Sequence, residues 1–361
     1  MKRKTMIFSL LILYIASLFV AGQQTYAQDS QKKEEVNPTG FAYKVIQPEN
    51  QQNKQVGYFD LRMKPSQKQT VQIELGNEGK EEIEVAVEIN GAKTNSNGVI
   101  EYGPTGIKND ASLKYAFEDL VKAPKTVKVP AKGTATVDLE ITMPAVDYDG
   151  VITGGIQLKN AQDEKDRSKK KGVINEYAFL VGMLLTESDK EVQPDLQLNK
   201  VSAGLSNYRN NVFVNFSNVQ AAYLENVTVD VQITKKDSEN VLYEAKKASM
   251  RIAPNSMVDF PVSMNGEKME PGTYKAHIAI NAADGKNWKW DEEFTITDEE
   301  ADKYNKQDVE LIQEKGIDWK IIAIVVAGAF VLILVVFLIV RAVNKNKKAK
   351  RKSKTKAREE K

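Results

Sequence analysis

Apolar and polar residues alternate along most of the chain between residues 41 and 297, and turn residues interrupt the pattern about every ten positions. A period of two is typical of strands that bury one face in a core and expose the other. Clear examples are the stretches 71–75, 83–89 and 135–141, in which valine, leucine and isoleucine occupy alternate positions. Short amphipathic strands at this spacing predict an all-β protein built of β-sandwiches.

The strand pattern occurs twice. A strand ending at Asn77 corresponds to one ending at Asn218, and each copy later reaches a proline between two strands, Pro130 or Pro254. The asparagine-to-proline distance is 53 residues in the first copy and 36 in the second, so the first copy carries an insertion. We therefore predict two tandem immunoglobulin-like β-sandwich domains of unequal size.

We place the first domain at 41–192 and the second at 193–297, with the junction in a charged stretch that ends at Pro194. Within the insertion, apolar residues at helical spacing predict a short helix near 111–122. After the second domain, Thr297 and Glu300 have the spacing of a capping box. This motif predicts a polar helical stalk over 298–320.

Both ends of the chain predict an exported membrane protein. A basic start, an apolar stretch and small residues predict a cleaved signal peptide over 1–27, followed by a linker over 28–40. Residues 321–340 contain no charge and have the length of one transmembrane helix. Eleven basic and two acidic residues follow in 341–361. The positive-inside rule makes this tail cytoplasmic, so we expect a single-pass protein of the cell membrane with its N-terminus and both domains outside.

The composition argues against nucleic acid as a partner and against catalysis. Residues 5–340 hold 37 basic and 47 acidic residues, a charge that repels nucleic acid. The chain has no cysteine and a single histidine, His277, which the alternation places on the polar face of its strand beside Lys275. A lone exposed histidine supports neither a catalytic triad nor a metal site. We expect no enzyme, no cofactor and no metal.

Two strands carry extra apolar residues. Trp288 and Trp290 share a strand face that continues into Phe294, which favours core packing over a platform for sugars. In 177–185 both strand faces are apolar, so the inserted helix, the second domain or a separate protein must cover the outer one.

We favour the inserted helix as this cover. We expect Leu180 and Leu184 to lie beneath it, in contact with Phe117 or Leu120.

The first strand ends in a loop of polar residues. Pro48 has no backbone donor and should end the ladder. Glu49, Asn50, Gln51 and Gln52 follow it and form our candidate site for a ligand or partner. These side chains could bind an amide-rich ligand, because amides donate and accept while a carboxylate accepts. For Asn50 and Gln51 we favour the alternative, in which they tie the loop to their own domain by side-chain-to-backbone bonds.

Several longer segments resemble one family. Residues 57–77, 148–158 ("YDGVITGGIQL") and 181–188 ("VGMLLTES") resemble the first domain of the WxL-interacting proteins of Gram-positive bacteria. Residues 252–262 ("IAPNSMVDFPV") and 288–296 ("WKWDEEFTI") resemble their second domain. The resemblance implies a cell-surface protein whose first domain binds peptidoglycan and whose second binds a host protein. It also implies a complex with proteins that carry WxL domains.

We therefore expect a non-catalytic, membrane-anchored adaptor that holds WxL-domain proteins and peptidoglycan at the Gram-positive surface and contributes to adhesion. One alternative is an assembly chaperone that donates a strand to other surface proteins. A less favoured alternative is an enzyme acting on the cell wall, because the groups that such catalysis needs are missing.

Overall fold

The computed structural model describes residues 39–162, 175–283 and 285–312, together with 322–335, 337–338 and 341. The predicted signal peptide, nearly all of the linker and the tail beyond Arg341 lie outside this part, as do several residues of the predicted transmembrane segment. Among the helices that the structure describes, none combines the length and apolar character needed to cross a membrane.

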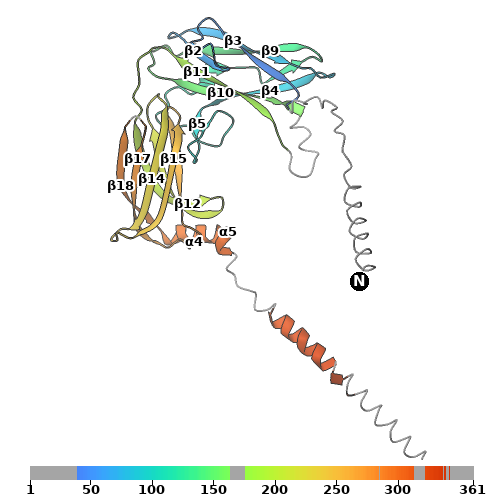
Figure 1. The fold of residues 1–361 in the computed structure, drawn as a ribbon, viewed down its shortest axis with the longest axis vertical. Helices are drawn as coiled ribbons and strands as arrows, with labels where there is room; N and C mark the ends of the chain where they lie inside the picture. Colours follow the sequence, from blue (N-terminus) through green and yellow to red (C-terminus); the bar gives the residue numbers. More distant parts are fainter. Residues whose placement is uncertain are drawn as a thin grey trace, which may run out of the picture.

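The first domain is a sandwich of two sheets (Figure 1). One sheet has the order β1-β3-β9-β7 and the other β2-β11-β10-β4-β8. The strands are β1 (Ala42–Ile46), β2 (Phe59–Arg62), β3 (Lys68–Gly76), β4 (Ile83–Gly91), β7 (Val121–Lys122), β8 (Thr126–Val129), β9 (Thr134–Thr142), β10 (Ile152–Asn160) and β11 (Ala178–Thr186). Neighbouring strands are antiparallel except β2 and β11, which are parallel. The inward side chains of the two sheets form one core.

The second domain is a smaller sandwich with a core of its own. Its sheets have the orders β12-β13-β16 and β15-β14-β17-β18. The strands are β12 (Leu196–Ser206), β13 (Arg209–Asn218), β14 (Leu224–Lys235), β15 (Val241–Ile252), β16 (Ser256–Ser263), β17 (Gly272–Asn281) and β18 (Asn287–Ile296). All its strand pairs are antiparallel. The structure thus agrees with the predicted all-β class and with two tandem sandwiches.

The two asparagines that mark the sequence repeat have equivalent positions. Both are buried at the end of a strand. The Nδ2 atom of Asn77 donates to the carbonyls of Val129 and Pro130, at 3.1 Å each, and that of Asn218 donates to the carbonyl of Ala253, at 3.0 Å. Each asparagine therefore joins its strand end to the segment around the repeat's proline, 53 or 36 residues later.

The inserted helix is shorter than predicted. Helix α2 spans only Phe117–Leu120, because Val121 and Lys122 pair with β9 as strand β7. The predicted helix over 111–122 was therefore wrong in its length. The earlier part of the insertion forms a small hairpin, β5 (Lys93–Thr94) and β6 (Ile100–Glu101), instead.

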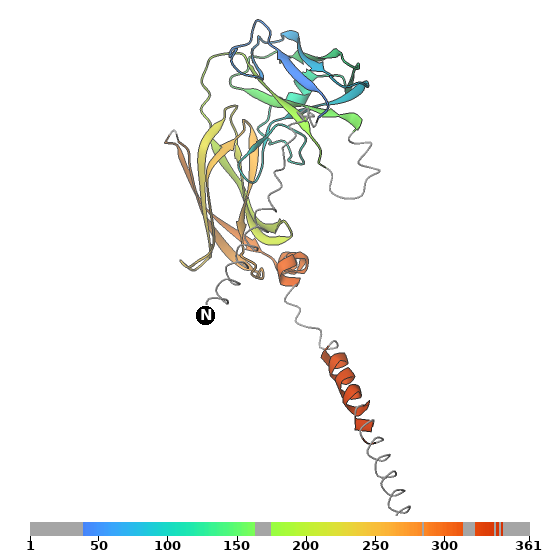
Figure 2. The same ribbon diagram turned by 45° about the vertical axis from the view of Figure 1, so that its right-hand side comes forward.

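This hairpin contacts the second sandwich, which lies below one end of the first sandwich in both views (Figures 1 and 2). The buried Thr94 donates its backbone N–H to the Ser256 hydroxyl at 2.9 Å, and its own hydroxyl accepts the Ala253 N–H at 2.9 Å. Nearby, the Tyr223 hydroxyl donates to the Thr153 hydroxyl at 2.8 Å. The two domains therefore share a hydrogen-bonded interface.

The helix after the second domain begins as predicted but does not stand free. Helix α4 (Asp298–Gln307) starts with the capping box of Thr297 and Glu300, and the short helix α5 (Val309–Ile312) follows it. Between them Asp308 is fully buried and its carboxylate accepts the Asn210 N–H at 2.7 Å. The predicted polar stalk is therefore wrong for its first part, which packs against the second sandwich.

Candidate functional site

The loop after β1 is held by its own amides. Gln51 is buried, and its side-chain Nε2 donates to the carbonyls of Asn53 at 2.9 Å and Tyr58 at 3.0 Å. Its Oε1 accepts the Asp60 N–H at 3.1 Å. Gln51 thereby satisfies three backbone groups of the loop that leads into β2, as the favoured interpretation of the sequence required.

Asn50 ties the same loop to the neighbouring strands. Its Nδ2 donates to the Arg62 carbonyl at 2.8 Å and to Gln69 Oε1 at 3.0 Å, while its Oδ1 accepts from Gln69 Nε2 at 2.8 Å. The backbone adds a bond from the Arg62 N–H to the Asn50 carbonyl at 3.0 Å. These bonds fix the loop against β2 and β3.

The other two predicted site residues face solvent. Gln52 is exposed and links Arg62, which donates to its Oε1 at 2.7 Å, to Thr186, which accepts from its Nε2 at 3.0 Å. Arg62 also pairs with Asp189 in the segment that follows β11. Glu49 is exposed, and within the described part of the chain no hydrogen bond or ion pair engages it.

Beside this loop lies a shallow hollow of about 470 Å³. Its lining is polar apart from Met63 and Pro65, and consists of Asn50, Arg62, Met63, Lys64, Pro65, Ser66 and Gln67. The hollow combines amides fixed in place with the cationic groups of Arg62 and Lys64, a set that can bind carboxylates and peptide groups.

Of the four predicted residues only Asn50 lines this hollow. Arg62 and Lys64 were not among the predicted residues, because they come from the end of β2 and the turn after it. The polar turn around Pro65 was the signal that could have identified them.

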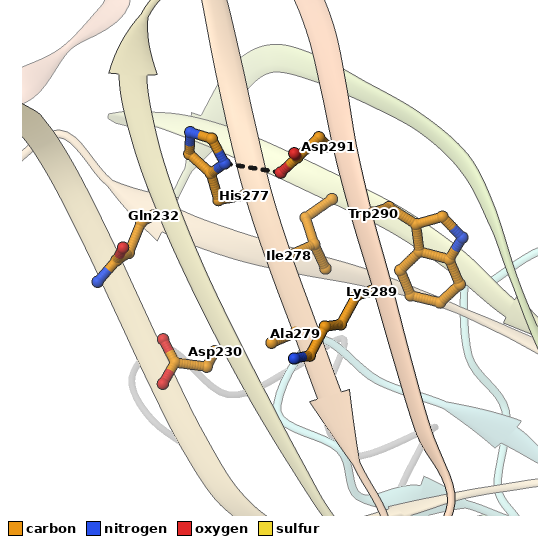
Figure 3. Close-up of a pocket in the computed structure, with 8 residues that line it drawn as sticks. All are labelled: Asp230, Gln232, His277, Ile278, Ala279, Lys289, Trp290 and Asp291. Carbon is orange, nitrogen blue, oxygen red and sulfur yellow. Dashed lines mark hydrogen bonds and ion pairs between the residues drawn. The ribbon is translucent and has the colours of Figure 1, made fainter. Parts of the chain in front are cut away.

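A second polar hollow, of about 470 Å³, lies on the outer face of the larger sheet of the second domain (Figure 3). His277 and Asp291 point toward each other, with Nδ1 and Oδ1 2.6 Å apart. This hydrogen bond, helped by the charge of Lys275, lowers the pKa of the Asp291 carboxyl. Lys289 and Asp230 flank the small side chain of Ala279.

His277 lies on the polar face of its strand, as predicted, but it is half-buried and has a carboxylate partner. Trp288 and Trp290 are partly buried and pack against the core of the second domain, which agrees with the core interpretation. No group of three or more histidine, aspartate or glutamate side chains that could hold a metal ion occurs among the residues that the structure describes.

The outer face of β11 is not covered as predicted. Leu180 is 45% exposed, whereas Phe117 of α2 is buried in the first core. Phe117 enters the sandwich against β10, where a Cβ at Gly154 would lie 2.1 Å from its ring. Because this glycine leaves room for the ring, Phe117 of α2 packs into the core and does not cover Leu180 on the outer face of β11.

Among the solved structures that resemble this chain are several distant likenesses. The chaperone–tip adhesin complex of CFA/I fimbriae is 12% identical, with a TM-score of 0.29 over 63% of this chain and 93% of that chain. The CsuC–CsuE chaperone–tip adhesin complex of Acinetobacter baumannii is 13% identical, with a TM-score of 0.29 over 64% and 93%. The E. coli chaperone DraB is 10% identical, with a TM-score of 0.25 over 71% and 97%. At such scores the likeness carries no argument about this chain.

No curated protein matches the sequence. Two family models do match, one after the other along the chain. The peptidoglycan binding domain of WxL Interacting Protein matches residues 41–160, and the host binding domain of WxL Interacting Protein matches residues 168–306. The second match begins before β11, so it includes one strand that completes the first sandwich. Together the matches span both sandwiches in the order that the sequence predicted, and the chain belongs to the WxL-interacting protein family.

Proposed function

We propose that the chain is a non-catalytic cell-surface adaptor whose first sandwich binds peptidoglycan and whose second binds a host ligand. The observation that carries the proposal is the order of the two family matches: the first covers most of the first sandwich, and the second covers β11 and the whole second sandwich, which has a core of its own. Both families are families of binding domains. We further propose that a protein with a WxL domain joins the complex.

We propose that peptidoglycan contacts the hollow beside the amide loop. Peptidoglycan carries peptides, so it offers carboxylates to Arg62 and Lys64 and N–H groups to Glu49. Gln52 supports the site by accepting from Arg62, which lines the hollow. Asn50 and Gln51 act indirectly, since their bonds hold the loop in place.

We propose that residues 321–340 anchor the protein in the cell membrane, with the basic tail in the cytoplasm. Their uncharged composition supports this, as do the eleven basic residues that follow and the helical conformation of 322–335. For the WxL partner we propose the outer face of β11, because Leu180 is 45% exposed there.

Sedimentation of the detergent-solubilised chain with purified peptidoglycan tests the proposal. The wild type should sediment, the variant Lys64→Glu should remain in solution, and Lys44→Glu should behave as the wild type. Lys44 is a matched control, because it is also an exposed lysine of the first domain but lies on β1 outside the hollow. A wild type that stays in solution would contradict peptidoglycan binding, and release of soluble fragments would favour the enzyme.

A second experiment separates the adaptor from the strand-donating chaperone. The full chain is purified from cells together with whatever protein it holds. An adaptor should retain a WxL-domain protein in fixed stoichiometry throughout purification, whereas a chaperone should release its client upon assembly.

A further inference from the structure

The exposed apolar side chains of the second sandwich gather at one end. Among the described residues from 193 to 312, the large apolar side chains that are well exposed are those of Tyr208 (69%), Val241 (44%), Leu242 (40%) and Val309 (42%). All four lie at the end from which α5 leaves, and we call this end the base. Tyr208 occupies the turn between β12 and β13, and its carbonyl accepts the Val309 N–H at 3.0 Å.

Hydrogen bonds connect the parts of the base. Beside Val241 and Leu242, the Tyr243 hydroxyl donates to the Glu267 carboxylate at 3.0 Å. The Glu267 carbonyl accepts from Asn210 Nδ2 at 3.2 Å, and the Asn210 N–H is bound by the buried Asp308. The start of β15, the turn after β16 and α5 therefore form one surface. The opposite end of the sandwich contacts the first domain (Figures 1 and 2).

The point at which the chain leaves the base toward its C-terminus is fixed by hydrogen bonds. Asp308 accepts the N–H groups of Asn210 and Glu310, at 2.7 and 2.8 Å, and so locks the start of α5 to β13. Only residues 313–320 separate α5 from the uncharged segment 321–340. A fully extended chain of this length spans about 30 Å. If the segment 321–340 crosses the membrane, the base must lie within this distance of the hydrocarbon layer.

Several charges of the base are paired with one another. Three acidic side chains each have a basic partner, in the pairs Arg209–Glu310 at 2.6 Å, Lys235–Glu270 at 3.4 Å and Lys236–Glu293 at 2.8 Å. Paired charges lose less on partial desolvation than isolated ones. Tyrosine is also enriched at the level of lipid headgroups, where its ring is buried while its hydroxyl stays hydrated.

We propose that the base is a lipid-contact surface that rests on the outer leaflet, with Tyr208, Val241, Leu242 and Val309 in the headgroup region. This contact orients the second sandwich upright and directs the first sandwich away from the membrane. The inference rests on the proposed membrane anchor, but neither the family matches nor the anchor itself requires the base to touch lipid.

The chain has no cysteine, so a single cysteine introduced for labelling is the only thiol in the protein. The full chain with Tyr208→Cys or Leu242→Cys, labelled with a fluorophore, is reconstituted into nanodiscs of phosphatidylcholine and phosphatidylglycerol that contain a headgroup-nitroxide lipid. The control is Val146→Cys, which is 62% exposed in the first domain. We expect strong quenching of both labels on the base and none at position 146. Circular dichroism checks that every variant is folded.

Three results would overturn the inference in distinguishable ways. If the protein co-purifies with nanodiscs and all three labels remain equally bright, the anchor stands and the lipid contact is refuted. If the protein does not associate with nanodiscs at all, the proposed anchor fails, and the lipid contact fails with it. Shielding of the base labels only after a partner protein is added would also refute the lipid contact, and would assign the base to that protein.

Discussion

Asn50 and Gln51 use most of their hydrogen-bonding capacity within their own domain. Replacing both by alanine leaves half-buried backbone groups at Tyr58 and Asp60 without their side-chain partners, and a buried group left so costs about 1–3 kcal/mol. We expect the double variant Asn50→Ala, Gln51→Ala to lower the free energy of unfolding by about 2–4 kcal/mol, measured by urea denaturation. Glu49→Ala is the control and should leave stability unchanged. A double variant that melts like the wild type would contradict this role.

Asp291 gives a prediction about pH. Its hydrogen bond to His277 lowers its pKa in the folded protein, so the charged carboxylate stabilises the fold. This contribution is complete above the unfolded pKa of about 3.9 and is lost as the pH falls through the lower folded value. We expect His277→Ala to raise the pKa of Asp291 toward its ordinary value, as followed by NMR titration of the carboxyl carbon. An unchanged titration would show that Lys275 alone sustains the shift.

The two faces of strand β11 differ in burial. Leu180 is half-exposed, whereas the adjacent Val181 is buried in the core. We expect Leu180→Asp to change the free energy of unfolding by less than about 0.5 kcal/mol, as for an ordinary surface substitution. Val181→Asp, which places a charge in the core, should unfold the first sandwich. Both outcomes can be read from thermal melting.

The same pair of variants tests the proposed partner surface. Folded Leu180→Asp should lose its WxL-domain protein during co-purification from cells, because the charge disrupts an apolar contact. Retention of the partner would remove this face from the interface. A melting temperature as low as that of Val181→Asp would instead show that an element covers Leu180.

Helices α4 and α5 belong to the second domain. Asp308→Ala leaves the buried N–H of Asn210 without its acceptor, and we expect a loss of about 1–3 kcal/mol in chemical denaturation of the full chain. Asp302→Ala is the matched control, because Asp302 is an exposed aspartate on α4. Equal stability of the two variants would show that the helices contribute nothing to the second fold.

Alternation along the chain predicted the strands because each one buries a single face, a property that the strand's own residues determine. The length of α2 could not be predicted in this way, since it depends on the pairing of Val121 and Lys122 with β9. The exposure of Leu180 depends on Gly154, a residue of another strand that admits the Phe117 ring. Pro48 located the candidate loop, but Arg62 and Lys64 reach the same hollow only through the folding of β2 against it.

At the scale of the whole molecule, the insertion of the first sandwich connects two domains that each have a complete core. Because the cores are separate, we expect residues 28–192 and 193–312 to fold independently. The contacts at Thr94, Tyr223 and Thr153 should then set how the domains are held together, and with this the distance between the peptidoglycan site and the base.

Thr94→Val tests this coupling with almost no change in volume. It removes the hydroxyl that accepts from the Ala253 N–H at 2.9 Å and from the Ser256 hydroxyl at 3.1 Å. Both donors remain buried in the domain interface. A buried donor without a partner costs about 1–3 kcal/mol, and this cost arises only when the domains are docked. The variant should therefore destabilise the two-domain protein in calorimetry but leave the isolated first domain unchanged. Thr70→Val, at an exposed position of β3, controls for the substitution itself. An equal loss of stability in the isolated domain would mean that Thr94 supports its own sandwich, and that other contacts fix the angle between the two.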